Sequence, residues 1–91
     1  MSVIWKYPIE ITDEQEIEMP SDSKILSVSQ SGLICLYVYV FNPASPKIKR
    51  KIVIFGTGNK IEKDPGGKYI GTITTHGQSL VWHIFEDKRD S

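Results

Sequence analysis

The sequence has few sulfur and nitrogen ligands for a metal ion. Cys35 is its one cysteine, so no disulfide can form within the chain, and only two histidines accompany it. These residues cannot supply the four ligands of a structural zinc site without carboxylates. The acidic stretch Glu10–Glu18 also lacks the residue order of a calcium-binding loop. We therefore expect no metal site and no cofactor.

An excess of charge of either sign is also absent. Eleven Lys and Arg residues balance eleven Asp and Glu residues, so the formal net charge is zero. A general nucleic-acid binder needs a strong positive field, and a protein that mimics DNA needs an excess of carboxylates. We therefore expect neither DNA nor RNA as a partner.

The chain contains no long hydrophobic run. Its longest apolar stretch, Leu33–Phe41, is about half the length needed to span a bilayer. The opening MSVIWKYPIE lacks the apolar run and the small-residue cleavage site of a secretory signal. We expect a soluble protein of the cytoplasm with no membrane partner.

With 91 residues the chain has room for one domain, residues 1–91. A chain of this length buries roughly 60 to 65% of its unfolded surface, which leaves a thin core. Association of identical chains covers surface that so small a core leaves exposed. We therefore expect a homo-oligomer.

Alternation of apolar and polar residues with a period of two dominates the sequence. β-Branched and aromatic residues are frequent in these segments, and no long window shows a helical period. The expected strands are Val3–Tyr7, Glu10–Met19, Lys24–Gln30, Leu33–Phe41, Lys51–Phe55, Tyr69–Thr75 and Leu80–Glu86. Short strands with turns between them predict an all-β fold, a small single-domain antiparallel sandwich or barrel of about six to seven strands.

Two of these segments carry more detailed expectations. Every position of Leu33–Phe41 is apolar, which predicts a strand covered on both faces, and the Ser31–Gly32 turn predicts a hairpin with the preceding strand. In Glu10–Met19, Thr12 and Gln15 fit a helix capping box, but alternating glutamates fit a half-exposed strand better. We favour the strand and keep a helical turn as the alternative.

Two charged segments flank the expected apolar strands. Lys47–Lys51 is expected to be a solvated edge protected by its lysines, with a phosphate-binding patch as the alternative. Glu86–Ser91 is a mixed-charge tail that we expect to be frayed.

The glycine-rich loop after Phe55 matches neither common nucleotide-enzyme motif. Residues 56–58 read Gly-Thr-Gly, but Ile61 stands where a dinucleotide fingerprint needs its third glycine, and no helical pattern follows. Residues 67–68 read Gly-Lys but precede a tyrosine, whereas a Walker loop requires Ser or Thr there. The loop therefore carries no recognised catalytic signature.

A weaker role as an anion site remains for this loop. The favoured interpretation is that its glycines supply the positive φ angles of turns. The alternative is a nest of backbone N–H groups that binds a phosphate. The ligand-binding candidates of that nest are Gly56, Thr57, Gly58, Lys60 and Lys68.

The residues with catalytic potential lie at positions where packing or solvent exposure is expected. His83 lies in an apolar strand, which predicts a core or subunit-interface histidine, and His76 lies at a polar turn that predicts solvent exposure. Cys35 lies in the most apolar strand, where a thiol is normally inert packing. We expect no catalytic residue and no enzyme. The alternative is a small hydrolase that uses one of the two histidines.

Aromatic residues are numerous for so small a core. Most of them must fill the two faces of the core, but rings with a polar end are also favoured where a surface contacts a partner or stacks on a base. Trp5 and Tyr7 share one face of the first expected strand, with Lys6 on the other. This pair is therefore the aromatic candidate for a ligand-binding surface.

Several stretches together carry a family resemblance. They are Ile4–Pro8, Ile11–Asp13, Ile17–Pro20, Lys24–Val28, Phe55–Asn59, Tyr69–Thr72 and Val81–Glu86. In them the chain resembles a family of short, uncharacterised proteins, a domain of unknown function, encoded by tailed bacteriophages and prophages. The resemblance implies a phage protein that acts in the cytoplasm of a host bacterium, and it supplies no catalytic residues.

The resemblance also implies a functional hypothesis, because small non-enzymatic phage proteins are often counter-defence factors. We expect an accessory binding protein that sequesters a nucleotide-type immune signal. Two alternatives stay open, namely a protein that inhibits a bacterial defence or host protein directly and an accessory of virion assembly. The expected partner is thus a nucleotide signalling molecule or a bacterial defence protein.

Overall fold

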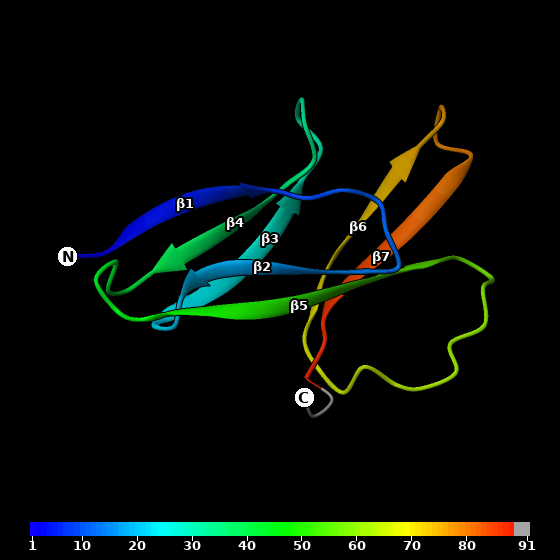
Figure 1. Ribbon diagram of the computed structural model, residues 1–91. Helices are drawn as coiled ribbons and strands as arrows, with labels where there is room; N and C mark the ends of the chain where they lie inside the picture. Colours follow the sequence, from blue (N-terminus) through cyan, green and yellow to red (C-terminus); the bar gives the residue numbers. More distant parts are fainter. Residues whose placement is uncertain (89–91) are drawn as a thin grey trace.

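The chain folds into a sandwich of two antiparallel β-sheets. The computed structural model describes residues 1–88, which form seven strands and no helix (Figure 1). The strands are β1 (Val3–Pro8), β2 (Glu14–Pro20), β3 (Ser23–Ser29), β4 (Cys35–Val40), β5 (Lys47–Gly56), β6 (Tyr69–Thr75) and β7 (Leu80–Glu86). One sheet has the order β1-β4-β3 and the other the order β2-β5-β7-β6. The expected all-β, antiparallel fold is confirmed.

The hydrophobic core lies between the inner faces of the two sheets. In β4 the alternate residues Leu36, Val38 and Val40 are fully buried. Ile52 of β5 and Ile84 of β7 belong to the same cluster of buried side chains. Because residues opposite each other on paired strands point to the same side, these positions define the inner face of every strand.

The β3–β4 hairpin expected from the Ser31–Gly32 turn is confirmed. The two strands pair antiparallel, with Ile25 opposite Val38, and Gly32 adopts a φ of 89° that favours glycine. The connection is longer than expected, since β4 begins at Cys35 and Leu33 is 83% exposed in the loop.

The expectation that the strand at Leu33–Phe41 is covered on both faces was wrong. Tyr37 and Phe41 are 37% and 47% exposed, and only the inner face of β4 is closed by the other sheet. A two-layer sandwich has no third layer to cover this side. An uninterrupted apolar run therefore marks here a strand with an aromatic outer face.

The favoured interpretation of Glu10–Met19 as a strand rather than a helical turn is confirmed from Glu14 onward, as β2, whereas residues 10–13 form a loop before it. The glutamates of β2 are exposed while Met19 is fully buried, as the alternation predicted. Thr12 and Gln15 do interact, since the Gln15 amide donates to Thr12 Oγ1 over 3.0 Å. That bond ties the strand to the loop before it and caps no helix.

The basic segment Lys47–Lys51 was expected to be a solvated edge before a strand, but it is the first half of β5. It pairs with β2 so that Lys49 lies opposite Glu18 and Lys51 opposite Glu16. Opposite charges across an antiparallel pair stabilise the pairing modestly. The pairing joins segments about thirty residues apart in sequence, which local charge pattern alone does not reveal.

The two sheets meet along one side, where β3 lies beside β6; we call this the β3–β6 seam. The Gln30 amide donates to Thr74 O over 2.6 Å and accepts from Thr74 N over 3.0 Å, so it completes the edge of β6 as a strand would. A Cβ at Gly71 would stand 2.6 Å from Val28 Cγ1, so glycine is needed for this approach. The sandwich is therefore closed on this side.

The expectation of a frayed tail at Glu86–Ser91 was wrong for the described residues of this segment, since Asp87 N donates to Lys51 O and Lys88 N donates to Pro65 O. Arg89–Ser91 lie outside the described residues. Glu86 ends β7 and is only 4% exposed. The carboxylate is buried because an arginine from β5 pairs with it, as described below.

Candidate functional site

The glycine turn at the end of β5 is explained by local structure. Asn59 N donates to Gly56 O over 3.0 Å, which closes the turn, and Gly58 adopts a φ of 87°. A Cβ at Gly56 would stand 2.8 Å from Asn59 Nδ2 and 3.2 Å from Trp82 Cζ3. Both glycines thus serve the turn, which agrees with the favoured interpretation of this loop.

Trp82 is the aromatic residue that accompanies this turn. Its indole N–H donates to Thr75 Oγ1 over 2.9 Å, so its ring is held in place. The ring borders a hollow of about 350 Å³ and a second hollow of about 300 Å³. Both hollows also reach Gly56 and Asn59, so they lie against the same turn. Trp82 was not among the residues expected at a ligand site.

The larger of these, which we call the Trp82 hollow, combines an apolar wall with charges of both signs. Ile54 and Phe55 contribute to its wall beside Trp82. Its charged residues are Lys60, Lys63, Asp13 and Glu62. Two ammonium groups and two carboxylates cancel formally, so the hollow suits a ligand with few charges.

The residues expected to bind a ligand are brought together only in part. Lys60 lines the Trp82 hollow, and Thr57 lines the smaller hollow next to it. Lys68 lies elsewhere, because its ammonium donates to Ile25 O over 2.8 Å at the β3–β6 seam. That lysine joins the two sheets.

The expected aromatic pair lies away from the glycine turn. Trp5 is opposite Val38 and Tyr7 opposite Leu36, so both are on the inner side of β1. Trp5 is still 38% exposed, whereas Tyr7 is half-buried against the core and burial raises the pKa of its hydroxyl. Figure 1 shows β1 on the far side of the molecule from the loop between β5 and β6.

His83 lies on the outer face of its sheet and is half-buried, so of the two expected positions the core is wrong, and the subunit interface stays a prediction. Its Nε2 is 2.6 Å from Thr57 Oγ1, and its Nδ1 is 3.1 Å from Thr72 Oγ1. The Tyr69 hydroxyl extends this chain to Thr72. Both ring nitrogens are thus engaged by hydroxyl groups. His76, in contrast, is exposed at a turn as expected, with a φ of 54°.

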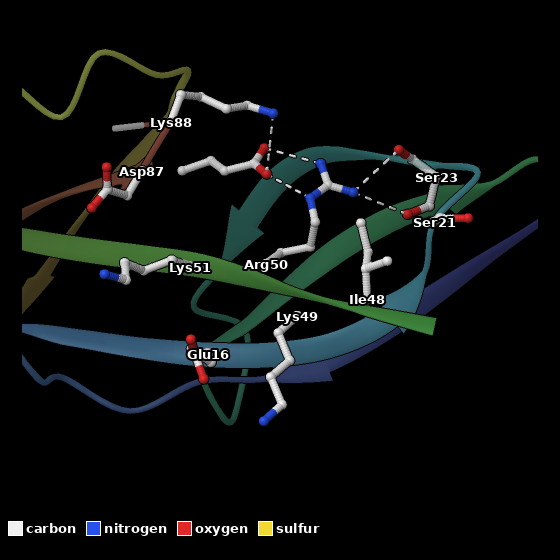
Figure 2. A pocket seen from close by; sticks show the side chains of 10 residues that line it. Glu16, Ser21, Ser23, Ile48, Lys49, Arg50, Lys51, Asp87 and Lys88 are labelled. Carbon is white, nitrogen blue, oxygen red and sulfur yellow. Dashed lines mark hydrogen bonds and ion pairs between the residues drawn. The ribbon is translucent and has the colours of Figure 1, made fainter. Parts of the chain in front are cut away.

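A groove of about 470 Å³ next to β5 contains a buried ion pair that was not predicted from the sequence (Figure 2). Arg50 Nε donates to Glu86 Oε2 over 2.5 Å, and Arg50 Nη2 donates to Glu86 Oε1 over 3.0 Å. The remaining nitrogen, Nη1, lies 3.3 Å from Ser23 Oγ and 3.4 Å from Ser23 O. Arg50 therefore ties β5 and β7 to β3, and its donors are already used within the fold.

One signal of this pair was present in the sequence. Arg50 is the only arginine in a run that otherwise uses lysine for its charges. Arginine is preferred over lysine for bidentate, buried pairing with a carboxylate. The position of its partner in another strand is set by the fold.

Acid is expected to weaken this ion pair. Burial alone would raise the pKa of Glu86, but hydrogen bonding and attraction from Arg50, with help from Lys88, outweigh burial and hold this pKa below its ordinary 4.5. Because the pKa of Glu86 is lower in the folded than in the unfolded protein, the ion pair stabilises the fold fully above the unfolded pKa. This stabilisation is lost as the pH falls through the folded pKa. Glu86→Gln should therefore be about 1.5–3 kcal/mol less stable than the native chain at pH 7.

Urea unfolding of both proteins between neutral and acidic pH checks this expectation. The difference in unfolding free energy should shrink as the pH falls below 4.5, where Glu86 of the unfolded chain begins to take up a proton before that of the folded chain. A difference that stays constant over this range would show that the charge of Glu86 contributes nothing.

The remaining features of the described residues concern metal ligands, the cysteine thiol and membrane-spanning helices. Within residues 1–88, no three His, Cys, Asp or Glu side chains are grouped closely enough to hold a metal ion. Cys35 is buried, which agrees with inert packing. The same part of the chain has no helix long and apolar enough to cross a membrane.

Comparison with other proteins places the chain in a family. No curated protein and no solved structure gives a match. One family model matches residues 1–91, and its description is "Domain of unknown function (DUF7352)". The motifs that run through the sequence are thus those of a family, and the chain belongs to the DUF7352 family.

Proposed function

We propose that this protein is a non-enzymatic binding protein that holds a small nucleotide-type ligand in the Trp82 hollow. The observation that supports the proposal is a fixed tryptophan ring that borders two hollows at one turn, with Lys60 and Lys63 lining the larger. An aromatic ring accepts a base by stacking, worth about 1–3 kcal/mol per base. A lysine supplies a charge for a phosphate.

The charges of the hollow narrow the ligand class. A di- or triphosphate would bring several negative charges to a site whose own charges cancel. A ligand with one charge per nucleotide, such as a cyclic mononucleotide or a cyclic dinucleotide, fits this balance better, because a nucleoside monophosphate carries close to two charges at pH 7. Asp13 and Glu62 then accept hydrogen bonds from ribose hydroxyls or from base amino groups.

Thermal unfolding with a panel of nucleoside monophosphates, cyclic mononucleotides and cyclic dinucleotides tests the proposal. A bound ligand at a hundred times its dissociation constant adds about 2.7 kcal/mol to stability. For a domain of this size that raises the unfolding temperature by roughly 10 °C or more. Lys60→Glu should weaken the binding at least about tenfold, since it replaces the charge that faces the phosphate.

Lys47→Glu is the matched control, because this exposed lysine lies at the other end of β5 and does not line the hollow. It should bind as the native chain does. If no nucleotide of the panel shifts the unfolding temperature, the proposal is wrong. If a ligand binds but is released chemically altered, the hydrolase alternative replaces it.

The biological part of the proposal is that a phage encodes the protein and that it acts in the cytoplasm of the host, where it sequesters a nucleotide immune signal. The resemblance of its motifs to those of phage proteins supports this part. The engagement of both His83 ring nitrogens and the burial of Cys35 agree with a protein that binds its ligand without altering it.

A second candidate function is direct inhibition of a bacterial protein. The outer face of the β1-β4-β3 sheet favours it, because Ile4 and Tyr37 are exposed there and Tyr39 and Phe41 pack together with ring centroids 4.7 Å apart. Aromatic and aliphatic side chains of this kind are frequent in the centre of protein interfaces. An inhibitor would ignore nucleotides and co-purify with its target, and Tyr37→Glu would release that target.

A further inference from the structure

The sandwich is closed on one side and open on the other. Gln30 and Lys68 bridge the β3–β6 seam by hydrogen bonds to backbone atoms of the facing strand. On the opposite side, within residues 1–88, β1 pairs only with β4 and β2 pairs only with β5. Each of these two strands therefore presents a row of backbone N–H and C=O groups to a further strand.

The two open edges differ in charge. β1 carries a single charged residue, Lys6, which lies opposite Tyr37 and therefore on the outer face. β2 carries three glutamates on its outer face, Glu14, Glu16 and Glu18. Natural edge strands are usually protected by charged side chains. β2 has that protection, whereas β1, with Ile4 56% exposed, has little of it.

The inner faces of the two edge strands, β1 and β2, are also complementary. Trp5 is on the inner side of β1 and is 38% exposed at the open side. On β2, Ile17 is half-buried on the inner side. A strand placed beside β1 therefore needs acidic residues on one face and apolar residues on the other, which is the pattern of β2.

We propose that two copies of this chain join at their open sides, with β1 of each copy beside β2 of the other. β1 and β2 are similar in length, with six and seven residues, and run in opposite directions (Figure 1). A two-fold axis parallel to the strands keeps the direction of each strand, so both new pairings of β1 with β2 are antiparallel. Lys6 then lies among the partner copy's glutamates on the outer face. Trp5 meets apolar residues on the inner face, and both sheets continue across the dimer.

The charges favour this arrangement over the other two-fold arrangement of the same open edges. If β1 paired with β1 and β2 with β2, the three glutamates of each copy would face one another, and like charges across a strand pair are destabilising. A face-to-face dimer through Tyr37 would likewise bring Lys6 and Lys24 of each copy together, since β1, β3 and β4 contain no acidic residue. The β1–β2 pairing alone matches opposite charges.

Sedimentation equilibrium or native mass spectrometry of the purified full chain over a dilution series tests the proposal. The native chain should be a dimer that dissociates on dilution. By symmetry Lys6→Glu replaces an attraction between opposite charges with a repulsion between like charges at both new pairings. It should therefore raise the dissociation constant at least about tenfold.

Lys24→Glu is the matched control, because this exposed lysine is on the outer face of the same sheet but on β3, at the closed side. It should dimerise as the native chain does. A native chain that stays monomeric throughout the series would overturn the proposal and leave β1 as an edge for another protein. A dimer that Lys6→Glu does not weaken would show that the copies join elsewhere. The result does not depend on whether the Trp82 hollow binds a nucleotide.

Discussion

Arg50→Ala is expected to lower the free energy of unfolding by about 3–5 kcal/mol, because it leaves the carboxylate of Glu86 buried without its bidentate partner. Arg50 and Glu86 side chains are only 12% and 6% exposed, so water cannot replace the lost contacts well. Lys88 remains 3.5 Å from Glu86, but it is 53% exposed and compensates little. The unfolding temperature should fall by roughly 12 °C or more.

Two companion variants separate the ion pair from general effects of substitution. Lys49→Ala removes an exposed cation from the same strand and should change stability by no more than about 0.5 kcal/mol. The double variant Arg50→Met/Glu86→Leu removes both charges and should be more stable than Arg50→Ala, since it strands no buried carboxylate. An Arg50→Ala protein within about 1 kcal/mol of the native chain would contradict this role of the pair.

Gly67→Ala is the second substitution with a large expected effect. A Cβ at this position would overlap the carbonyl oxygen of Glu86 and stand 2.9 Å from Lys88 N. Both are backbone atoms, held by the bonds from Glu86 N to Lys68 O (2.8 Å) and from Lys88 N to Pro65 O (3.0 Å). The added methyl group must therefore separate the loop from β7, and we expect a loss of about 3 kcal/mol or more.

Gly77→Ala is the control for this substitution. Gly77 has open space around it, and its φ of 63° makes alanine unfavourable for conformational reasons alone. That strain costs about 1–2 kcal/mol. Urea unfolding measures the loss of unfolding free energy in both variants, provided that the slopes of their curves equal that of the native chain. If Gly67→Ala costs no more than Gly77→Ala, the close approach of the loop to β7 is not important for stability.

Much of the fold could be predicted because strand patterning is local. The alternation of Glu14, Glu16 and Glu18 with apolar residues set both the strand and its buried face. Errors arose where a residue's partner lies far away in sequence. Lys47–Lys51 was misjudged because its pairing with β2 depends on the register of the sheet. The outer face of β4 was misjudged because an apolar residue does not show whether a further layer covers it.

The candidate site could be predicted less well than the fold. Turn glycines are visible in sequence, so the turn at Gly56 was anticipated. Trp82 was missed because the pairing of β5 with β7 places Trp82 directly opposite Gly56. Lys68 was assigned to the loop because of its neighbours in sequence, but its side chain reaches Ile25 in the other sheet. Distances across the sandwich, unlike turns and alternation, are not encoded locally.

Native mass spectrometry of the protein, purified gently from bacteria with an active nucleotide-signalling defence, tests the central claim most directly. The proposal predicts a small extra mass on the folded protein that denaturation releases unchanged and that matches a nucleotide. Lys60→Glu should carry much less of it, and Lys47→Glu should carry as much as the native chain. A native chain without bound nucleotide under these conditions would contradict the claim and favour a protein target.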